Sequence, residues 1–201
     1  MSVQQIIKKR RTIRIYKKKL ISKNLIKKII ESGRWAPSPH NSQPWLFVVI
    51  RNNKLKEKLL KLLNRSSKEF LVGVRVLFKN TIQIIEKAPL IILVYNTKSF
   101  SQKVKKLGEP YFSNAYISEI QGISSAIQNM YLMATSLGIG MAWLTFPLLV
   151  KEKINRLLKI KKYELVAILT LGYPAERGKR LKRKSLSEIV KFIEEESYIK
   201  K

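Results

Sequence analysis

The chain has no cysteine among its 201 residues and a single histidine, His40. Without cysteine it can form no disulfide, no thiolate metal site and no cysteine nucleophile. One histidine is too few for a multi-histidine metal centre, and no Gly-x-Ser-x-Gly stretch supplies the serine of a hydrolase triad. We therefore expect no metal site and no catalytic side chain, and predict that a bound cofactor carries any chemistry.

Long apolar runs are also absent. No run approaches the roughly 20 residues that a membrane-spanning helix needs. The start, Met1-Ser2-Val3-Gln4-Gln5, leads into a basic helical pattern without the apolar region of a signal peptide. These absences predict a cytoplasmic protein with no membrane partner.

Acidic residues are scarce: 13 Asp and Glu stand against 41 Lys and Arg, for a formal net charge of +28. Such a charge suits a nucleic acid or another anionic surface, because Lys and Arg release counterions from phosphate backbones. It also fits a lysine-rich composition spread over solvated faces. Lys and Ile recur along the whole chain instead of in one arm, which favours the second interpretation.

Apolar periodicity predicts alternating helices and strands. Buried strands are expected over residues 45–50, 90–95 and 164–171, and residues 141–146 are strand-like. Helices are expected over residues 2–11, 22–33, 53–63, 68–87, 118–137, 147–158 and 185–197, the last as a helix or docking tail, with a loop over residues 98–113. Ser22 fits an N-cap, and Gly138 lies just past the strongest helix. About four strands among helices, with no internal repeat or linker, predict one α+β or α/β layered unit over residues 1–201.

The segment Arg10-Arg11-Thr12-Ile13-Arg14 is the first candidate binding motif. If it is extended, residues 10, 12 and 14 project to one side, so that two guanidinium groups and a hydroxyl face the same point. This arrangement suits a phosphate dianion. The alternative is a solvated basic run.

A second candidate is the stretch A-P-S-P-H-N-S-Q-P-W at residues 36–45. Its prolines stiffen the backbone and reduce the entropy lost on ordering. Asn41 and Gln43 each offer a donor and an acceptor, which would match a heterocycle with alternating carbonyl and N–H edges. A capped turn with Trp45 in the core explains the same residues, and the stretch alone leaves both possibilities open.

The pair Gly138-Ile139-Gly140 does not indicate a Rossmann site, because Trp143 stands where the third glycine belongs and the pair follows a helix. We expect these glycines to end the helix and to let the next strand's backbone approach a neighbour closely.

Four segments in order resemble the nitroreductase family of FMN-dependent oxidoreductases, and together they run from about residue 6 to residue 190. They are RRTIR, APSPHNSQPW, GISSAIQNMYLMATSLGIGMAWL and LVAILTLGYPAERGKRLKRKSLSEIV. The resemblance implies an α+β fold with a mostly antiparallel sheet flanked by helices. It also implies a homodimer that joins through long central helices and holds two FMN molecules at the interface.

The resemblance also implies which residues bind the cofactor. Arg10, Arg11, Thr12, Arg14 and Arg183 would hold the FMN phosphate and ribityl chain. Pro37, Ser38, Asn41 and Gln43 would reach the flavin bound mainly by the partner subunit. Gln128 would contact the flavin or ribityl region, and the backbone around Leu144 and Thr145 would line the ring near N5. The short segment after Arg183 puts a long tail wrapped over the partner in doubt.

By the same resemblance, NADH or NADPH would deliver hydride to flavin N5 and then leave, and a nitroaromatic or quinone-like acceptor would follow in a ping-pong reaction. Two biosynthetic alternatives share this chemistry: an FMN reductase of the coenzyme F420-maturation type, and the flavin-destroying enzyme of benzimidazole synthesis. A flavin-binding protein without turnover is a third. A basic nucleic-acid-binding module remains a fourth, although Trp45, Phe47, Tyr95 and Trp143 lie in apolar runs that indicate a core instead of a binding face.

Overall fold

The computed structural model describes residues 1–193, and in this range four strands form one antiparallel sheet in the order β1-β2-β4-β3. The strands are β1 (Trp45–Ile50), β2 (Leu90–Asn96), β3 (Gly140–Leu144) and β4 (Glu164–Gly172). The helices are α1 (Val3–Lys9), α2 (Lys23–Arg34), α3 (Asn53–Ser67), α4 (Val72–Lys87), α5 (Ser101–Val104), α6 (Glu109–Ser136) and α7 (Lys151–Leu158). The expected α+β fold is confirmed.

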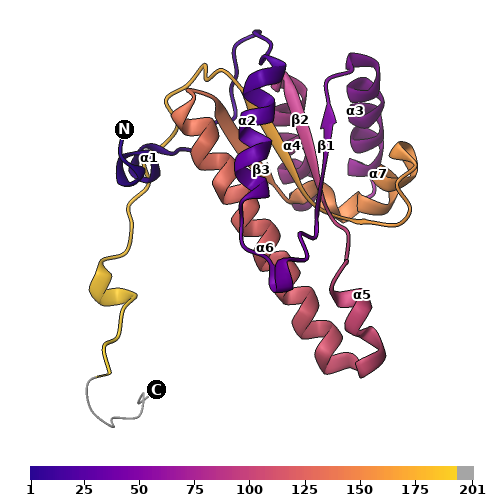
Figure 1. Ribbon diagram of the computed structural model, residues 1–201. Helices are drawn as coiled ribbons and strands as arrows, with labels where there is room; N and C mark the ends of the chain where they lie inside the picture. Colours follow the sequence, from indigo (N-terminus) through magenta and orange to yellow (C-terminus); the bar gives the residue numbers. More distant parts are fainter. Residues whose placement is uncertain (194–201) are drawn as a thin grey trace.

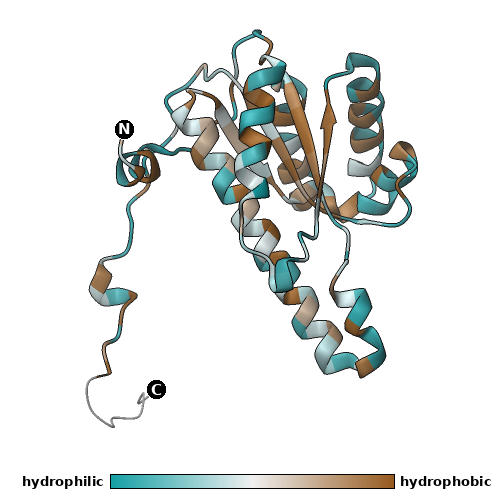
Figure 2. Cartoon of the chain, in the orientation of Figure 1, coloured by the Kyte–Doolittle hydropathy of each residue, from teal (hydrophilic) through white to brown (hydrophobic). Residues whose placement is uncertain are grey.

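Helices cover both faces of the sheet, as Figure 1 shows. Alternate side chains of the central strand β2 point to opposite faces, since successive residues of a strand do so. Leu90, Ile92 and Val94 pack with α2 and α6, whereas Ile91, Leu93 and Tyr95 pack with α3, α4 and α7. The apolar strands therefore lie between helices whose outer faces are largely hydrophilic (Figure 2).

The two predicted boundary residues behave as expected. The Ser22 hydroxyl accepts a hydrogen bond from the Leu25 N–H at 3.3 Å and caps α2. Gly138 follows the last turn of α6 with φ of 71°, a left-handed conformation that glycine adopts without steric cost.

The predicted loop over residues 98–113 is wrong. This range contains α5, a 3-10 turn η2 (Lys105–Leu107) and the first residues of α6, which begins at Glu109 instead of residue 118. The first half of α6 projects with α5 beyond the sheet (Figure 1). Tyr111 and Ile117 are accordingly exposed, so the segment lacks the one-sided apolar period that identifies a packed helix.

Two further expectations are also wrong. The first is that residues 45–50 are buried on both faces and that Trp143 lies in the core: β1 and β3 are the outer strands of the sheet, so most of β1 is only half-buried and Trp143 of β3 is exposed. The predicted terminal helix over residues 185–197 is a single 3-10 turn, η4 (Leu186–Glu188), as far as residue 193, and residues 194–197 lie outside the described range.

Within residues 1–193, no helix is both long enough and apolar enough to cross a membrane.

Candidate functional site

The basic N-terminal segment lies along the outer edge of β3. Thr12 forms a parallel bridge with Met141, and the Ile13 N–H donates to the Met141 carbonyl at 3.0 Å. Gly140 makes this approach possible, because a Cβ there would lie 2.7 Å from the Ile13 Cβ. The expectation that a glycine here lets the backbone of the next strand approach a neighbour closely is confirmed, since Gly140 is the first residue of β3.

Two polar side chains, the buried Tyr16 and the half-buried Glu176, bind the backbone of the same segment. The Tyr16 hydroxyl donates to the Ile13 carbonyl at 2.5 Å and lies 2.9 Å from the Thr170 hydroxyl. Burial raises the pKa of Tyr16 well above its ordinary value, so the phenol remains a neutral donor. Glu176 accepts the backbone N–H groups of Arg14 and Ile15 at 2.6 and 3.1 Å. The N-terminal segment is thereby joined to the stretch that follows β4.

Residues 7–14 and 179–183 line an open hollow of about 680 Å³, which we call the cationic hollow. No acidic side chain of the described residues lines it. Seven basic side chains do: Lys8, Arg10, Arg11, Arg14, Lys179, Arg180 and Arg183. Thr12 adds a hydroxyl, and Ile7 and Leu181 complete the wall. The structure thus brings together all five residues predicted to hold a phosphate. Clustered positive charges repel one another, and an anion bound among them offsets this repulsion. This hollow therefore fits a phosphate group.

Tyr131 lies beside the hollow, and the sequence analysis did not single it out. The Arg10 guanidinium lies 4.9 Å from the centre of the Tyr131 ring. The Tyr131 hydroxyl donates to the Met141 carbonyl at 2.5 Å. Burial raises the pKa of Tyr131, against the opposing effect of Thr12 and Arg10 beside it. Tyr131 therefore fixes Arg10 through a cation–π contact; the only signal in the sequence was a hydroxyl in a buried stripe.

The second predicted motif forms a tight turn around η1 (Pro39–Asn41). Three of its residues have left-handed backbones: His40, Asn41 and Gln43, with φ of 48°, 49° and 44°. Outside glycine, such conformations cost about 1–3 kcal/mol each and persist where neighbouring contacts impose them. The turn leaves the Asn41 and Gln43 carboxamides exposed, while Ser42 Oγ is buried with no partner among the described residues. Apart from one bond, in which Gln43 Nε2 donates to Asn41 Oδ1 at 3.3 Å, the two exposed carboxamides are open to a ligand edge.

Within one chain, the turn and the cationic hollow lie at different points along α6. Pro37 and Ser38 contact Gly122, where a Cβ would lie 3.2 Å from the Pro37 carbonyl oxygen. Arg10 contacts Tyr131, nine residues further along the helix. At a rise of 1.5 Å per residue this separates the two contacts by about 13 Å, and no turn residue lines the hollow.

The remaining predicted residues lie outside the cationic hollow. Gln128 is exposed on α6. Leu144 is buried at the end of β3, and Thr145 is exposed just before the 3-10 turn η3 (Phe146–Val150). The structure therefore does not gather these three residues with the arginines.

Comparison with known proteins identifies the family. The model described as "Nitroreductase family" matches residues 7–173. That match spans most of the chain, so the protein belongs to the nitroreductase family and is an oxidoreductase. A relative from Methanothermobacter thermautotrophicus, provisionally named an NADH dehydrogenase/NAD(P)H nitroreductase, is 31% identical over 88% of this chain and 79% of its own. Rat iodotyrosine deiodinase is 28% identical over 92% of this chain and 67% of its own.

Solved structures agree with this fold. A BluB-like flavoprotein from Clostridium difficile superposes with a TM-score of 0.81 at 28% identity, over 96% of this chain and 99% of its own. A provisionally named nitroreductase from Desulfovibrio desulfuricans, solved in complex with FMN, gives a TM-score of 0.73 at 26% identity over 98% of each chain.

Proposed function

We propose that this chain is an FMN-dependent oxidoreductase that uses NADH or NADPH to reduce an electron-poor small molecule. The observation that carries the proposal is the convergence of Arg10, Arg14 and Arg183 on one hollow that no acidic side chain of residues 1–193 lines. When bound, FMN would supply the chemistry by accepting hydride from the nicotinamide and passing electrons to the acceptor. The whole chain would act as one FMN-binding unit in the cytoplasm.

The residues of the hollow would hold the phosphate end of the cofactor. Arg10, Arg14 and Arg183 can donate charge-assisted hydrogen bonds to phosphate oxygens, and the Thr12 hydroxyl can donate one more. Arg11 donates instead to the Lys8 and Arg10 carbonyls at 2.8 and 2.6 Å, so its contribution would be to fix the loop and add charge. The same positive field would draw a phosphate-bearing dinucleotide towards the site.

A second copy of the chain would complete each site. Asn41 and Gln43 would offer their exposed carboxamides to the flavin bound in the partner's hollow, with Pro37 and Ser38 beside them. Gln128 and the backbone at Leu144 and Thr145 would lie nearer the ring. Two observations support this arrangement: the turn and the hollow are separated along α6, and the stretch after Gly178 exposes Leu186, Ile189 and Phe192. Apolar side chains exposed together are typical of an interface.

Complementation between two inactive variants would test the shared site. R14A/R183A removes the phosphate ligands, and N41A/Q43A removes the carboxamides, so each homodimer should bind FMN weakly. In a purified heterodimer of the two variants, one site keeps both sets of ligands and the other lacks both, because the interface is two-fold symmetric. We expect one tight site per heterodimer. A monomer that binds FMN tightly, or a heterodimer with no tight site, would contradict sharing.

The acceptor would be a nitroaromatic or quinone-like compound, the same class that the sequence motifs suggest. The similarity to iodotyrosine deiodinase supports a halogenated aromatic as an alternative acceptor. The F420-maturation and flavin-destroying activities considered from the sequence motifs are two further alternatives. Turnover with NADPH or NADH against nitroaromatics, quinones, iodotyrosine and deazaflavin precursors, each alone, would separate these acceptors.

The spectrum of freshly purified protein tests the proposal as a whole. We expect bound flavin, identified as FMN after extraction, and loss of its visible absorbance on anaerobic addition of NADH or NADPH. Protein that cannot be reconstituted with FMN would refute the proposal. Flavin that binds but is reduced by neither donor would favour a binding protein without turnover, and tight, salt-sensitive binding of RNA or DNA by flavin-free protein would favour the nucleic-acid alternative.

A further inference from the structure

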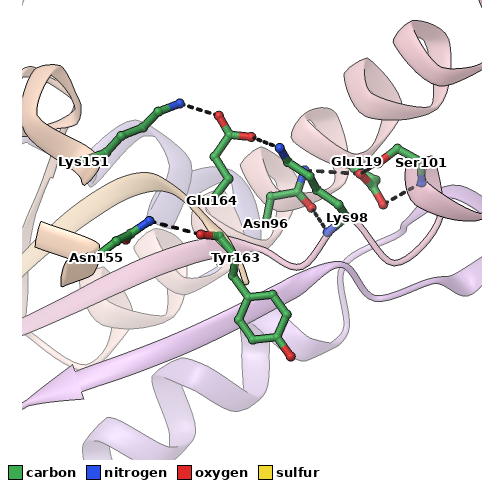
Figure 3. Close-up of polar contacts among 8 residues, drawn as sticks. All are labelled: Asn96, Lys98, Ser101, Glu119, Lys151, Asn155, Tyr163 and Glu164. Atoms are coloured by element: carbon green, nitrogen blue, oxygen red, sulfur yellow. Dashed lines mark hydrogen bonds and ion pairs between the residues drawn. The ribbon is translucent and has the colours of Figure 1, made fainter. Parts of the chain in front are cut away.

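Glu119 is a fully buried carboxylate in the middle of α6, and it does not belong to the cationic hollow. Four groups donate to it. The Phe100 and Ser101 N–H groups donate to Oε1 at 2.7 and 3.1 Å, and the Ser101 hydroxyl and Asn96 amide donate to Oε2 at 2.8 and 3.2 Å. Figure 3 shows Asn96 and Ser101 on either side of this carboxylate. Both oxygens thus act only as acceptors, which is the pattern of an ionised carboxylate.

All four donors lie within residues 96–101, which run from the last residue of β2 through a short loop to the first residue of α5. Lys98 in this loop has a left-handed backbone with φ of 56°, and its N–H donates to Asn96 Oδ1 at 2.8 Å. The Lys98 ammonium pairs with Glu164 at 2.9 Å (Figure 3). Glu119 and Glu164 therefore both bind this loop, and their contacts stabilise the left-handed backbone of Lys98, which is otherwise unfavourable.

Residues of the same loop also contact the turn around η1. The Thr97 N–H donates to the Pro44 carbonyl at 2.8 Å, and the Ser99 hydroxyl donates to the Ser42 carbonyl at 3.1 Å. The Phe100 ring packs on His40 with ring centres 4.7 Å apart. Along residues 96–101, contacts to the turn thus alternate with contacts to the two carboxylates.

Contacts within the turn are few. The Asn41 and Ser42 N–H groups donate to the Ser38 and Pro39 carbonyls at 3.1 and 2.9 Å. The side chains add Gln43 N–H to Ser38 Oγ at 3.0 Å and Gln43 Nε2 to Asn41 Oδ1 at 3.3 Å. The two side-chain bonds join exposed or half-exposed groups, which water can replace. The loop from Thr97 to Ser101 supplies the buried side of the turn.

We propose that Glu119 is a positioning residue for the cofactor: it fixes the loop 97–101, which in turn holds the Asn41 and Gln43 carboxamides in place for the flavin. This inference rests on the proposed function. It assigns a role to a residue that touches neither the hollow nor the turn.

The test compares E119Q with N155A. In E119Q, an amide NH₂ faces groups that are themselves donors, so the Asn96 contact is lost while the side-chain volume is kept. Asn155 is also a buried polar residue, and its amide donates to the Tyr163 carbonyl at 3.2 Å, away from the turn. N155A therefore controls for a general loss of stability, which thermal unfolding of both variants measures.

Two readouts are recorded for each variant. The first is the NMR signals of the His40 imidazole. Their assignment is unambiguous because the chain has one histidine, and their chemical shifts report the ring current of Phe100. The second is the FMN dissociation constant. We expect E119Q to shift or broaden the His40 signals and to weaken FMN binding at least 10-fold, while N155A changes neither.

Unchanged His40 signals in E119Q, or FMN binding no weaker than in N155A, would overturn the inference. If the wild-type protein binds no FMN, the proposed function fails, and the His40 spectra still decide whether Glu119 holds the turn. If E119Q does not fold, S101A takes its place, since it removes one donor and keeps the carboxylate. It should shift the His40 signals in the same direction by a smaller amount, and no shift would overturn the inference.

Discussion

Glu176 accepts the backbone N–H of Arg14 at 2.6 Å, across 162 residues of sequence. This bond lies beside the cationic hollow and joins the N-terminal segment to the stretch that carries Arg183. The two ends of the chain therefore have a defined relation at the place where their guanidinium groups converge.

Removing this carboxylate should loosen the N-terminal segment. We expect E176A to lower the free energy of unfolding by about 1–2 kcal/mol, since two backbone donors lose their acceptor. E176Q keeps an acceptor oxygen and should lose less than half as much. Denaturant unfolding and FMN titration of both variants check this; equal losses in the two variants would show that charge, not the bonds to Arg14 and Ile15, matters.

The arginines of the hollow should contribute separately to cofactor affinity. Hydrogen bonds to a charged group contribute about 1.5–3 kcal/mol, so R14A and R183A should each raise the FMN dissociation constant about 10- to 100-fold. R177A is the matched control, because Arg177 lies in the same C-terminal stretch but does not line the hollow. If R177A weakens binding as much as R183A, the effect is only one of net charge.

Gly140 should not tolerate a side chain. An added Cβ would lie within 2.9 Å of three carbon atoms of Ile13, and such overpacking costs about 1–3 kcal/mol. G140A should therefore lower stability and displace Thr12 and Arg14, with weaker FMN binding. G73A is the control, since nothing lies within 4 Å of a Cβ at Gly73. Thermal unfolding of both variants measures the difference, and a stable G140A would contradict the close contact at β3.

The ion pairs of Glu164 should give a pH-dependent contribution to stability. Burial opposes its charged form, but Lys151 at 2.6 Å and Lys98 at 2.9 Å outweigh burial, so the pKa of Glu164 is lowered. A carboxylate with a lowered folded-state pKa stabilises the fold above its unfolded pKa of about 4.3 and loses that contribution as pH falls through the folded value. The melting temperature of E164Q should thus lie below that of wild type at pH 7 and approach it near pH 3. E57Q, at an exposed position of α3, should show no such trend.

The sequence predicted the parts of the fold that depend on local pattern. β2 and β4 are central strands with continuous apolar runs, and Ser22 caps its helix as its residue type suggests. The arginine segment was also predictable, because alternate residues of an extended segment share a side. Its partner Arg183 came from family resemblance alone.

Other features depend on tertiary contacts and left no local signal. The first half of α6 packs little against the sheet, so its sequence lacks the one-sided apolar period of a packed helix. Tyr131 and Glu119 each acquire their roles from residues distant in sequence, Arg10 in one case and the loop 97–101 in the other. The separation of the turn from the hollow along α6 follows from packing that the spacing of motifs does not encode.

The affinity of the flavin-free protein for FMN compared with riboflavin tests the central claim most directly, because the two ligands differ only in the phosphate. If Arg10, Arg14 and Arg183 hold that group, FMN should bind at least 100-fold more tightly than riboflavin, and the difference should shrink as salt rises. Equal affinity for the two ligands would contradict the account.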